Sequence, residues 1–163
     1  MPIPEEARHI PDTPEHRTLD ERSSHCFGCS PANPQGLHLK FAIDAEAITA
    51  TAPVNLTRLH EGPPGYIHGG IIAALFDEAM SKLNRPLGVL AMTRNLQVDF
   101  LRPSPLSQPL TVTGKHLRRE GRKLFHEAQL TDQDGTILAK ATGLFIIIDP
   151  RLIPPTTQPA SPQ

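Results

Sequence analysis

A carboxylate, an imidazole and two glycines stand close together near the middle of the chain, at Asp77, His68, Gly69 and Gly70. Glycines at the start of a helix leave the first-turn N–H groups unshielded, at the positive end of the helix dipole. Such amides polarise a carbonyl oxygen and hold the oxyanion that forms on attack. A carboxylate can activate water or attack directly. The segment therefore offers the parts of a hydrolytic site, although a glycine pair alone is also typical of an ordinary tight helix entry.

A helix over residues 70–83 must position these groups, because breakers precede it at 61–65 and Asn84-Arg85-Pro86 follows it. At 100° per residue, apolar side chains gather on one stripe that must face a sheet: Ile72, Leu75, Phe76, Ala79 and Leu83. Asp77 lies beside the stripe among small side chains, where a substrate could approach; a surface aspartate near a dimer seam is the other interpretation. Glu78 lies nearly opposite the stripe, four residues before Lys82, which predicts a solvated ion pair.

Asp77 and Gly69 are too far apart on one helix to serve the same substrate carbonyl. They are separated by eight residues, or about 12 Å at the helical rise. Both groups must lie within roughly 3 to 3.5 Å of the reacting atoms. If both act, they come from two copies with antiparallel helices side by side, which gives two equivalent sites in a symmetric dimer. The sequence therefore predicts a homo-oligomer if it predicts an enzyme.

Six segments have the composition of strands: 37–44, 47–53, 92–102, 110–117, 122–130 and 136–148. Tight turns are expected at Glu120-Gly121 and Asp134-Gly135. Alternation in 92–102 predicts one dry face, formed by Met92, Leu96, Val98 and Phe100. The last segment is apolar on both faces, so we expect it at the centre of the sheet or under the helix. Two strands, one long helix and four strands in meander order predict an α+β domain with the helix lying on the sheet.

Composition bounds the class of protein. The 163 residues suffice for one domain, and 38% hydrophobic with 20% charged residues is typical of a globular chain. A net charge of -1 argues against a surface tuned for nucleic acid. There is no apolar run of membrane-spanning length and no signal-peptide pattern, so we expect a cytoplasmic protein with no membrane partner. Prolines crowd both ends, which predicts an arm at 1–24, flexible or docked, a structured domain at 25–149, and a Pro-rich tail at 150–163.

Two cysteines, Cys26 and Cys29, stand between His25 and His38 and suggest zinc ligands. A structural zinc site normally needs four ligands, and His38 is expected on a strand. We therefore interpret this segment as a turn packed with two thiols and predict no metal site.

The run from Glu61 to Met80 resembles the signature of PaaI-type hotdog thioesterases, in the branch that reads G-P-P-G-x-x-H-G-G. Asp77 stands nine residues after His68, as the family's catalytic acid does. Thr93 matches a threonine that some members place near the attacking water. The runs 100–103 (Phe-Leu-Arg-Pro) and 121–123 (Gly-Arg-Lys) also fit, so the resemblance covers about residues 25–148. It implies a hotdog fold: one long central helix wrapped by a curved antiparallel sheet of about six strands, dimerised into a larger sheet and often tetrameric.

The resemblance implies hydrolysis of an acyl-CoA to a free acid and CoA, without cofactor or metal. Asp77 would act as general base or nucleophile, and the Gly69 or Gly70 amide would hold the oxyanion. His68 would orient the loop, and Thr93 would hold water or the carboxylate. Some members carry Asn or Gln six residues before the histidine; here Gly62 stands there, so no side-chain amide assists.

The substrate would be bound by residues outside this segment. Cationic residues cluster at one predicted hairpin, and Arg122 and Lys123 could bind the CoA phosphates. The usual interpretation of such a cluster is an ordinary surface turn with solvated charges. Met80 and Met92 are apolar residues expected near the acyl group, and they leave the acyl chain open.

Two other functions remain open. One is a hotdog protein that binds acyl-CoA without hydrolysing it, as a sensor; the presence of Asp77 and the lack of a DNA-binding segment speak against it. The other is a hotdog dehydratase or hydratase. Dehydration or hydration usually requires a histidine paired with Asp or Glu for proton transfer, and His68 has no such partner nearby in the sequence.

Overall fold

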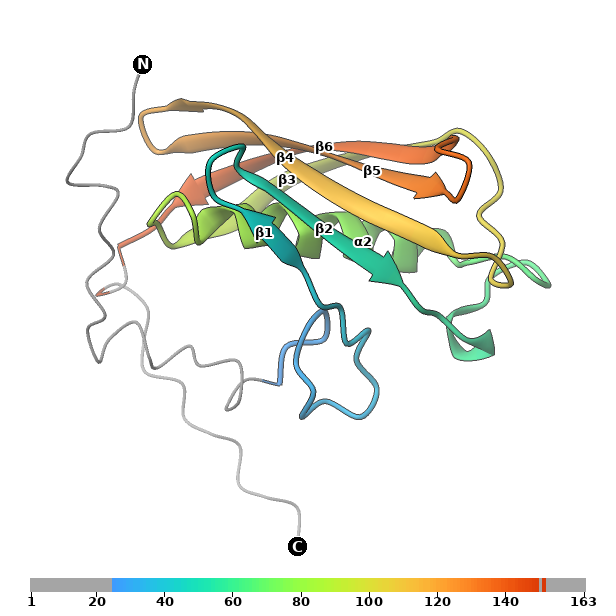
Figure 1. Ribbon diagram of the computed structural model, residues 1–163. Coiled ribbons are helices and arrows are strands. Elements are labelled where there is room, and N and C mark those ends of the chain that lie inside the picture. The colour runs from blue at the N-terminus through green and yellow to red at the C-terminus, as the bar shows by residue number, and fades with distance from the viewer. Residues whose placement is uncertain (1–24, 150, 152–163) are drawn as a thin grey trace, which may run out of the picture.

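The computed structural model describes residues 25–149 and 151, so the predicted arm and, except for Arg151, the predicted tail lie outside the described residues. One long helix lies against a six-stranded antiparallel sheet (Figure 1). Helix α2 spans Gly69–Ser81 and continues into the 3-10 turn η3 at Lys82–Asn84; a second such turn, η2, spans Arg58–His60. The strands are β1 (Ala42–Asp44), β2 (Thr49–Val54), β3 (Ala91–Phe100), β4 (Leu110–Glu120), β5 (Lys123–Asp132) and β6 (Ile137–Ile147). The predicted α+β class is confirmed.

The strands lie in the order β1-β2-β4-β5-β6-β3. Both predicted turns are present, since Gly121 and Gly135 adopt the positive φ angles that such turns require. Strand β6 lies between β5 and β3, as its apolar sequence predicts. The meander order is correct only for β4, β5 and β6. Strand β3 pairs with β6 and not with β4, because residues 101–109 carry the chain from one edge of the sheet to its interior.

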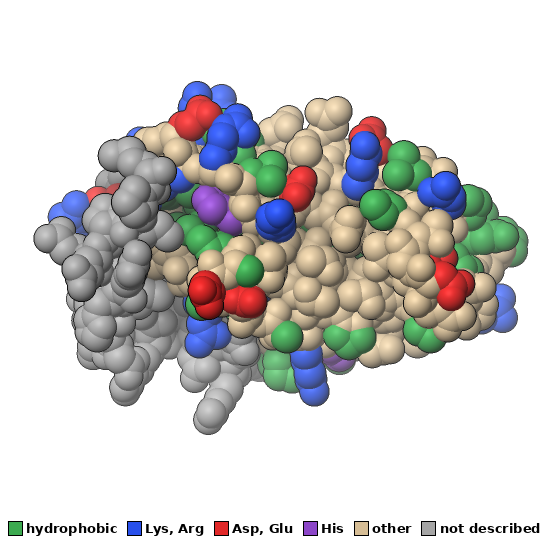
Figure 2. All heavy atoms as spheres, turned by 45° about the horizontal axis from the view of Figure 1, so that its top comes forward, with side chains coloured by type: hydrophobic (Ala, Val, Ile, Leu, Met, Phe, Trp, Pro, Cys, Tyr) green, Lys and Arg blue, Asp and Glu red, His purple; other side chains and the backbone are tan. Residues whose placement is uncertain are grey.

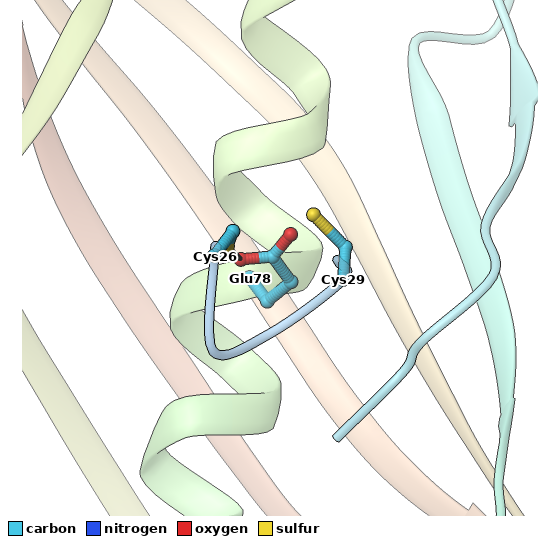
Figure 3. A group of neighbouring side chains, drawn as sticks. All are labelled: Cys26, Cys29 and Glu78. Carbon is cyan, nitrogen blue, oxygen red and sulfur yellow. Dashed lines mark hydrogen bonds between the residues drawn. The ribbon is translucent and has the colours of Figure 1, made fainter. Parts of the chain in front are cut away.

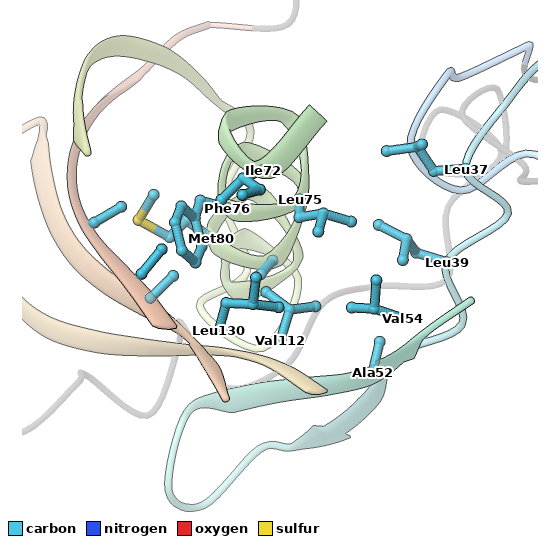
Figure 4. Packing of buried hydrophobic residues seen from close by; sticks show 14 of the residues in the cluster. Leu37, Leu39, Ala52, Val54, Ile72, Leu75, Phe76, Met80, Val112 and Leu130 are labelled. Carbon is cyan, nitrogen blue, oxygen red and sulfur yellow. The ribbon is translucent and has the colours of Figure 1, made fainter. Parts of the chain in front are cut away.

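The core fills the space between α2 and the sheet (Figure 4). All five predicted stripe residues of the helix segment are buried, as the 3.6-residue periodicity requires. The closest approach of helix and sheet is at Gly114 of β4. A Cβ atom there would lie 2.7 Å from the carbonyl oxygen of Ala79, so only glycine lets α2 lie this near the strand. None of the helices among residues 25–149 is long and apolar enough to span a membrane.

The predicted strand 37–44 is correct only for its last three residues. Upstream, the Leu37 and Leu39 N–H groups donate to the carbonyl oxygens of Phe27 (2.7 Å) and Gly28 (2.9 Å). His38, between them, has a φ of 52°. The turn that contains the cysteines therefore takes the backbone hydrogen bonds a strand would need. The same interaction brings the Leu37 and Leu39 side chains into the core, as Figure 4 shows.

The predicted dry face of β3 is correct for Leu96 and Val98, which pack against the core, but wrong for Met92. A bulge between Thr93 and Asn95 shifts the register against β6, so that Thr93 pairs with the buried Phe145 and Met92 pairs with Ile146 on the outer side. Thr93 therefore shares the helix-facing side with Leu96, and Met92 does not. Strand β3 is also an edge of the sheet, so Met92 and Phe100 remain 53% and 56% exposed in the single chain.

Candidate active site

Helix α2 begins with a cap made by His68. This residue has an extended backbone, and its Nδ1 accepts the N–H of Gly70 at 2.9 Å. The His68 carbonyl oxygen accepts the N–H groups of Ile71 (2.9 Å) and Ile72 (3.2 Å). The N–H of Gly69 has no hydrogen-bond acceptor within the described residues. The structure thus separates the two glycine amides, because only the Gly69 amide is available to a ligand.

The loop before the helix is fixed by backbone hydrogen bonds. Gly65, with a φ of 83°, donates its N–H to the Glu61 carboxylate at 2.7 Å, and the His68 N–H donates to the His60 carbonyl at 2.9 Å. The chain passes so close to itself that a Cβ atom at Gly62 would lie 2.9 Å from the Cα of His68. The glycine that replaces the family's amide side chain is therefore required by the path of this loop.

Asp77 and Thr93 are in direct contact. The hydroxyl of Thr93 donates to Oδ1 of Asp77 at 2.6 Å, a short charge-assisted hydrogen bond. The β3 bulge makes this contact possible, since it turns Thr93 toward the helix. Asp77 is half-buried, and its Oδ2 atom has no hydrogen-bond donor in the part of the chain that the structure describes. One carboxylate oxygen is held, and the other is left for a water molecule or a substrate.

The two halves of the predicted site lie at opposite ends of β3. Asp77 contacts Thr93 near the start of the strand. Gly69 faces its last residue, because a Cβ atom at Gly69 would lie 3.4 Å from the Phe100 ring. A single chain therefore does not bring the Gly69 amide to the Asp77 carboxylate.

The predicted substrate-binding residues are also not gathered around Asp77 within one chain. Met80 is fully buried, and a Cβ atom at Gly143 would lie 2.9 Å from its sulfur atom, so Met80 belongs to the core. Met92 lies on the outer side of the sheet. Arg122 and Lys123 are exposed at the β4–β5 turn. Lys123 pairs with Ile146, which in turn pairs with Met92, so the turn lies at the Thr93 end of the sheet.

Glu78 and Lys82 form the predicted ion pair, with Nζ and Oε1 3.1 Å apart, but the prediction of a solvated pair is wrong. Their side chains are only 13% and 18% exposed. The turn with Cys26 and Cys29 covers them, and the Lys82 ammonium donates to the Cys29 sulfur at 3.0 Å. Helical periodicity places Glu78 away from the sheet but does not show that another segment packs there.

Sequence reasoning also missed a pair of neighbouring histidines, one of which is buried. His126 on β5 is fully buried, and its Nδ1 lies 3.1 Å from Nδ1 of His116 on β4. Burial, and then the neighbouring His116, lower the pKa of His126 to about 4. Burial also lowers the pKa of His116, with Arg119 contributing. The signal in the sequence was the alternation of β5, in which His126 shares a face with Leu124 and Ala128.

The outer side of the sheet carries charged side chains of both signs, interspersed with hydrophobic ones (Figure 2). A shallow cavity of about 280 Å³ opens among residues of four strands. The guanidinium of Arg118 lies 3.8 Å above the Phe125 ring at this cavity, a cation–π contact. Asp77 and Gly69 are not among its lining residues.

Residues 64–139 match a family model described as the thioesterase superfamily. The acyl-coenzyme A thioesterase THEM4 of Bos taurus is 38% identical over 91 residues, which are 55% of this chain and 37% of that protein. The match thus spans well under half of that curated relative. A crystal structure of a thioesterase superfamily protein has a TM-score of 0.71 at 32% identity, over 75% of this chain and 60% of that one. A thioesterase protein of Streptococcus pneumoniae TIGR4, solved with coenzyme A, has a TM-score of 0.63 at 18% identity, over 68% and 85%.

Proposed function

Since the chain belongs to the thioesterase superfamily and has its hotdog fold, we propose that it hydrolyses an acyl-CoA to a free acid and CoA. The observation that carries the proposal is the Asp77 carboxylate, held through one oxygen by Thr93 at 2.6 Å with the other oxygen left open. The name of the bovine relative and the coenzyme A in the pneumococcal structure support an acyl-CoA as the substrate.

We propose that the complete site forms between two copies. Strand β3 offers a ten-residue edge with exposed apolar side chains, and an unpaired edge of this length is a template for a second strand. Antiparallel pairing of β3 with its copy about a point between Leu96 and Gln97 places Thr93 opposite the partner's Phe100. The same twofold axis passes near Ala73, midway between Gly69 and Asp77, where small side chains let the helices approach. Each Asp77 then faces the Gly69 amide of the other copy.

In this arrangement the roles follow from the contacts. Oδ2 of Asp77 removes a proton from water, which attacks the thioester carbon, or it attacks that carbon itself. The carbonyl oxygen becomes an oxyanion and accepts the Gly69 N–H of the partner subunit. Collapse of the intermediate breaks the carbon–sulfur bond, and the leaving sulfur takes up a proton to give free CoA. In the first route the free acid forms in the same step; in the second, water then hydrolyses the mixed anhydride on Asp77 to the free acid and restores the carboxylate. Thr93 orients the carboxylate, and His68 fixes the helix start so that the Gly69 amide points outward.

The CoA phosphates are assigned to the β4–β5 turn. Arg122 and Lys123 are exposed there, at the Thr93 end of the sheet. The Nε of Arg122 donates to the Ile147 carbonyl at 3.1 Å, which orients its guanidinium. Guanidinium and ammonium groups bind phosphates through charge-assisted hydrogen bonds.

The test is the release of CoA thiol from a panel of acyl-CoAs by the wild type and Asp77→Asn. We expect turnover to fall by roughly a hundredfold or more, the scale of a lost general base or nucleophile. Glu127→Gln is the matched control, because Glu127 is an exposed carboxylate of β5, away from the β3 edge, and should leave the rate unchanged.

Each other outcome points elsewhere. Turnover that survives in Asp77→Asn would move the chemistry away from this carboxylate. Binding of acyl-CoA without turnover on any substrate would favour the sensor. Hydration of an enoyl-CoA in place of thiol release would favour a hydratase.

A further inference from the structure

Three groups that bind metals meet on the side of α2 that faces away from the sheet (Figure 3). The sulfur atoms of Cys26 and Cys29 and a carboxylate oxygen of Glu78 all lie within 4.8 Å of one another. The cysteines are not joined by a disulfide. The Ser30 N–H donates to the Cys26 carbonyl at 3.1 Å, and this helical turn places both thiols on one side. Figure 3 shows the carboxylate of Glu78 reaching from the helix into the space between the cysteines.

Gly28, between the cysteines, makes room for this carboxylate. A Cβ atom at Gly28 would lie 2.3 Å from Oε2 of Glu78. Only glycine therefore allows Glu78 to enter the turn, and the carboxylate now contacts Cys26 at 3.6 Å from Sγ to Oε2. A carboxylate in this position would have to move away before the two sulfur atoms could join in a disulfide. The arrangement favours a shared cation over a sulfur–sulfur bond.

Lys82 already balances part of the charge. Its ammonium donates to the Cys29 sulfur (3.0 Å) and contacts Oε1 of Glu78 (3.1 Å), which leaves Oε2 toward Cys26. Although burial disfavours the Lys82 charge, the bond to Cys29 and the carboxylate raise the pKa of Lys82. Burial, and then Glu78, raise the pKa of Cys29 to about 12. Hydrogen bonds and one ion pair thus already join both cysteines, the Glu78 carboxylate and the Lys82 ammonium in one cluster.

We propose that Cys26, Cys29 and Glu78 form a zinc-binding site in which Zn²⁺ replaces the two thiol protons. The exchange is balanced: two thiols and Zn²⁺ give a zinc bis-thiolate and two protons. Thiolates select zinc over magnesium or calcium. Zn–S bonds of about 2.3 Å hold two sulfur atoms about 3.8 Å apart, which side-chain rotation from the present separation allows. Lys82 stays as a hydrogen-bond donor to Cys29, and water fills the fourth position.

The site would tie the turn that contains the cysteines to α2, one residue from Asp77. The proposal does not depend on thioesterase activity, because the metal is bound by Glu78 on the side of the helix away from the sheet. Its test needs no substrate.

The experiment uses the full chain, reduced and stripped of metal, under anaerobic conditions. Cobalt(II) serves as the spectroscopic probe. We expect one Co²⁺ per chain with a thiolate-to-cobalt charge-transfer band in the near ultraviolet, loss of the band on adding Zn²⁺, and release of about two protons per ion. Cys29→Ser and Glu78→Gln should weaken binding by at least about tenfold. Glu127→Gln, which changes an exposed carboxylate of β5, should bind as the wild type does.

The proposal fails if the wild type gives no charge-transfer band, or if Cys29→Ser binds cobalt equally well. In either case Lys82 would be the permanent cation of the cluster. It also fails if air oxidation removes both thiols as a disulfide and added Zn²⁺ does not prevent this. The wild-type band and proton count require no variant, so a substitution that unfolds the chain does not affect the decision.

Discussion

The imidazole of His68 meets the start of α2 through Nδ1, which accepts the Gly70 N–H at 2.9 Å. An atom that accepts a hydrogen bond carries no proton, so the proton of the neutral ring lies on Nε2. The cap occupies one of the two glycine amides and leaves the other open. The proposed oxyanion site at Gly69 thus depends on a neighbouring residue that need not touch the substrate.

This role gives a prediction that separates capping from proton transfer. His68→Ala should lower the free energy of unfolding by about 1 kcal/mol, because the Gly70 N–H loses its acceptor. His68→Asn should keep the free energy of unfolding close to that of the wild type, since asparagine is a strong N-cap residue. Its turnover should stay within about tenfold of the wild-type value. Urea denaturation and CoA release measure the two quantities. A loss of turnover by a hundredfold or more in the stable Asn variant would instead make His68 a proton carrier.

At this scale, residue types and spacing predicted which groups matter but not how they are paired. The distance between His68 and Asp77 is a property of the helix, so it could be read from the sequence. The sequence could not show which glycine amide is free, because this depends on the rotamer of His68. The contact between Thr93 and Asp77 depends on a bulge that no pattern in β3 announces. Glu78 was misjudged because its cover comes from a segment about fifty residues away.

At the scale of elements, strands β4 and β5 bring together the half-buried His116 and the fully buried His126. In the unfolded chain an imidazole takes up a proton near pH 6.5, whereas His126 in the folded chain does so only near 4. Between these values the unfolded state binds more protons, so the free energy of unfolding falls as the pH falls.

We expect this effect to remove about 3 kcal/mol of stability between pH 6.5 and 4, at about 1.4 kcal/mol per unit, and no more below 4. His116, with its pKa also lowered, acts in the same direction. The measurement is urea denaturation across this range for the wild type and His126→Leu, because the difference between them cancels the carboxylates that titrate in both. Parallel curves for the two proteins would show that His126 is already protonated in the folded state.

The helix and most of the strands were predictable because periodicity, apolar runs and turn residues are local signals, whereas the predicted strand 37–44 is correct only for its last three residues. The helix stripe was confirmed residue by residue, since 3.6-residue spacing is set locally. The pairing of β3 with β6 was missed, because consecutive strands usually lie side by side. The side of Met92 was missed because a single extra residue between Thr93 and Asn95 reverses the side chains that precede it, whereas Leu96 and Val98 lie on the predicted side.

For the whole molecule, the proposed dimer can be tested by mixing two inactive variants. Asp77→Asn removes the carboxylate. Gly69→Pro removes only the amide N–H, because proline is tolerated at the first helical position and His68 already has the extended backbone that precedes proline. Gly69→Ala keeps the N–H and should remain active. Each inactive variant alone should fail to release CoA.

Equal mixing with exchange of subunits should restore about a quarter of wild-type turnover, because half the dimers are mixed and each of these has one intact site. Light scattering establishes the mass of each sample, and CoA release measures the recovery. If both groups acted within one chain, mixing would restore nothing.

The two edges of the sheet are unequal, and this limits what the molecule can build. One edge, β3, has ten residues, while the other, β1, has only three. Such a subunit is monovalent for strand addition: pairing through β3 joins two copies, and the dimer then presents only its two short β1 edges. Growth stops at the first step, and the same edge that would complete two active sites cannot propagate into a fibre.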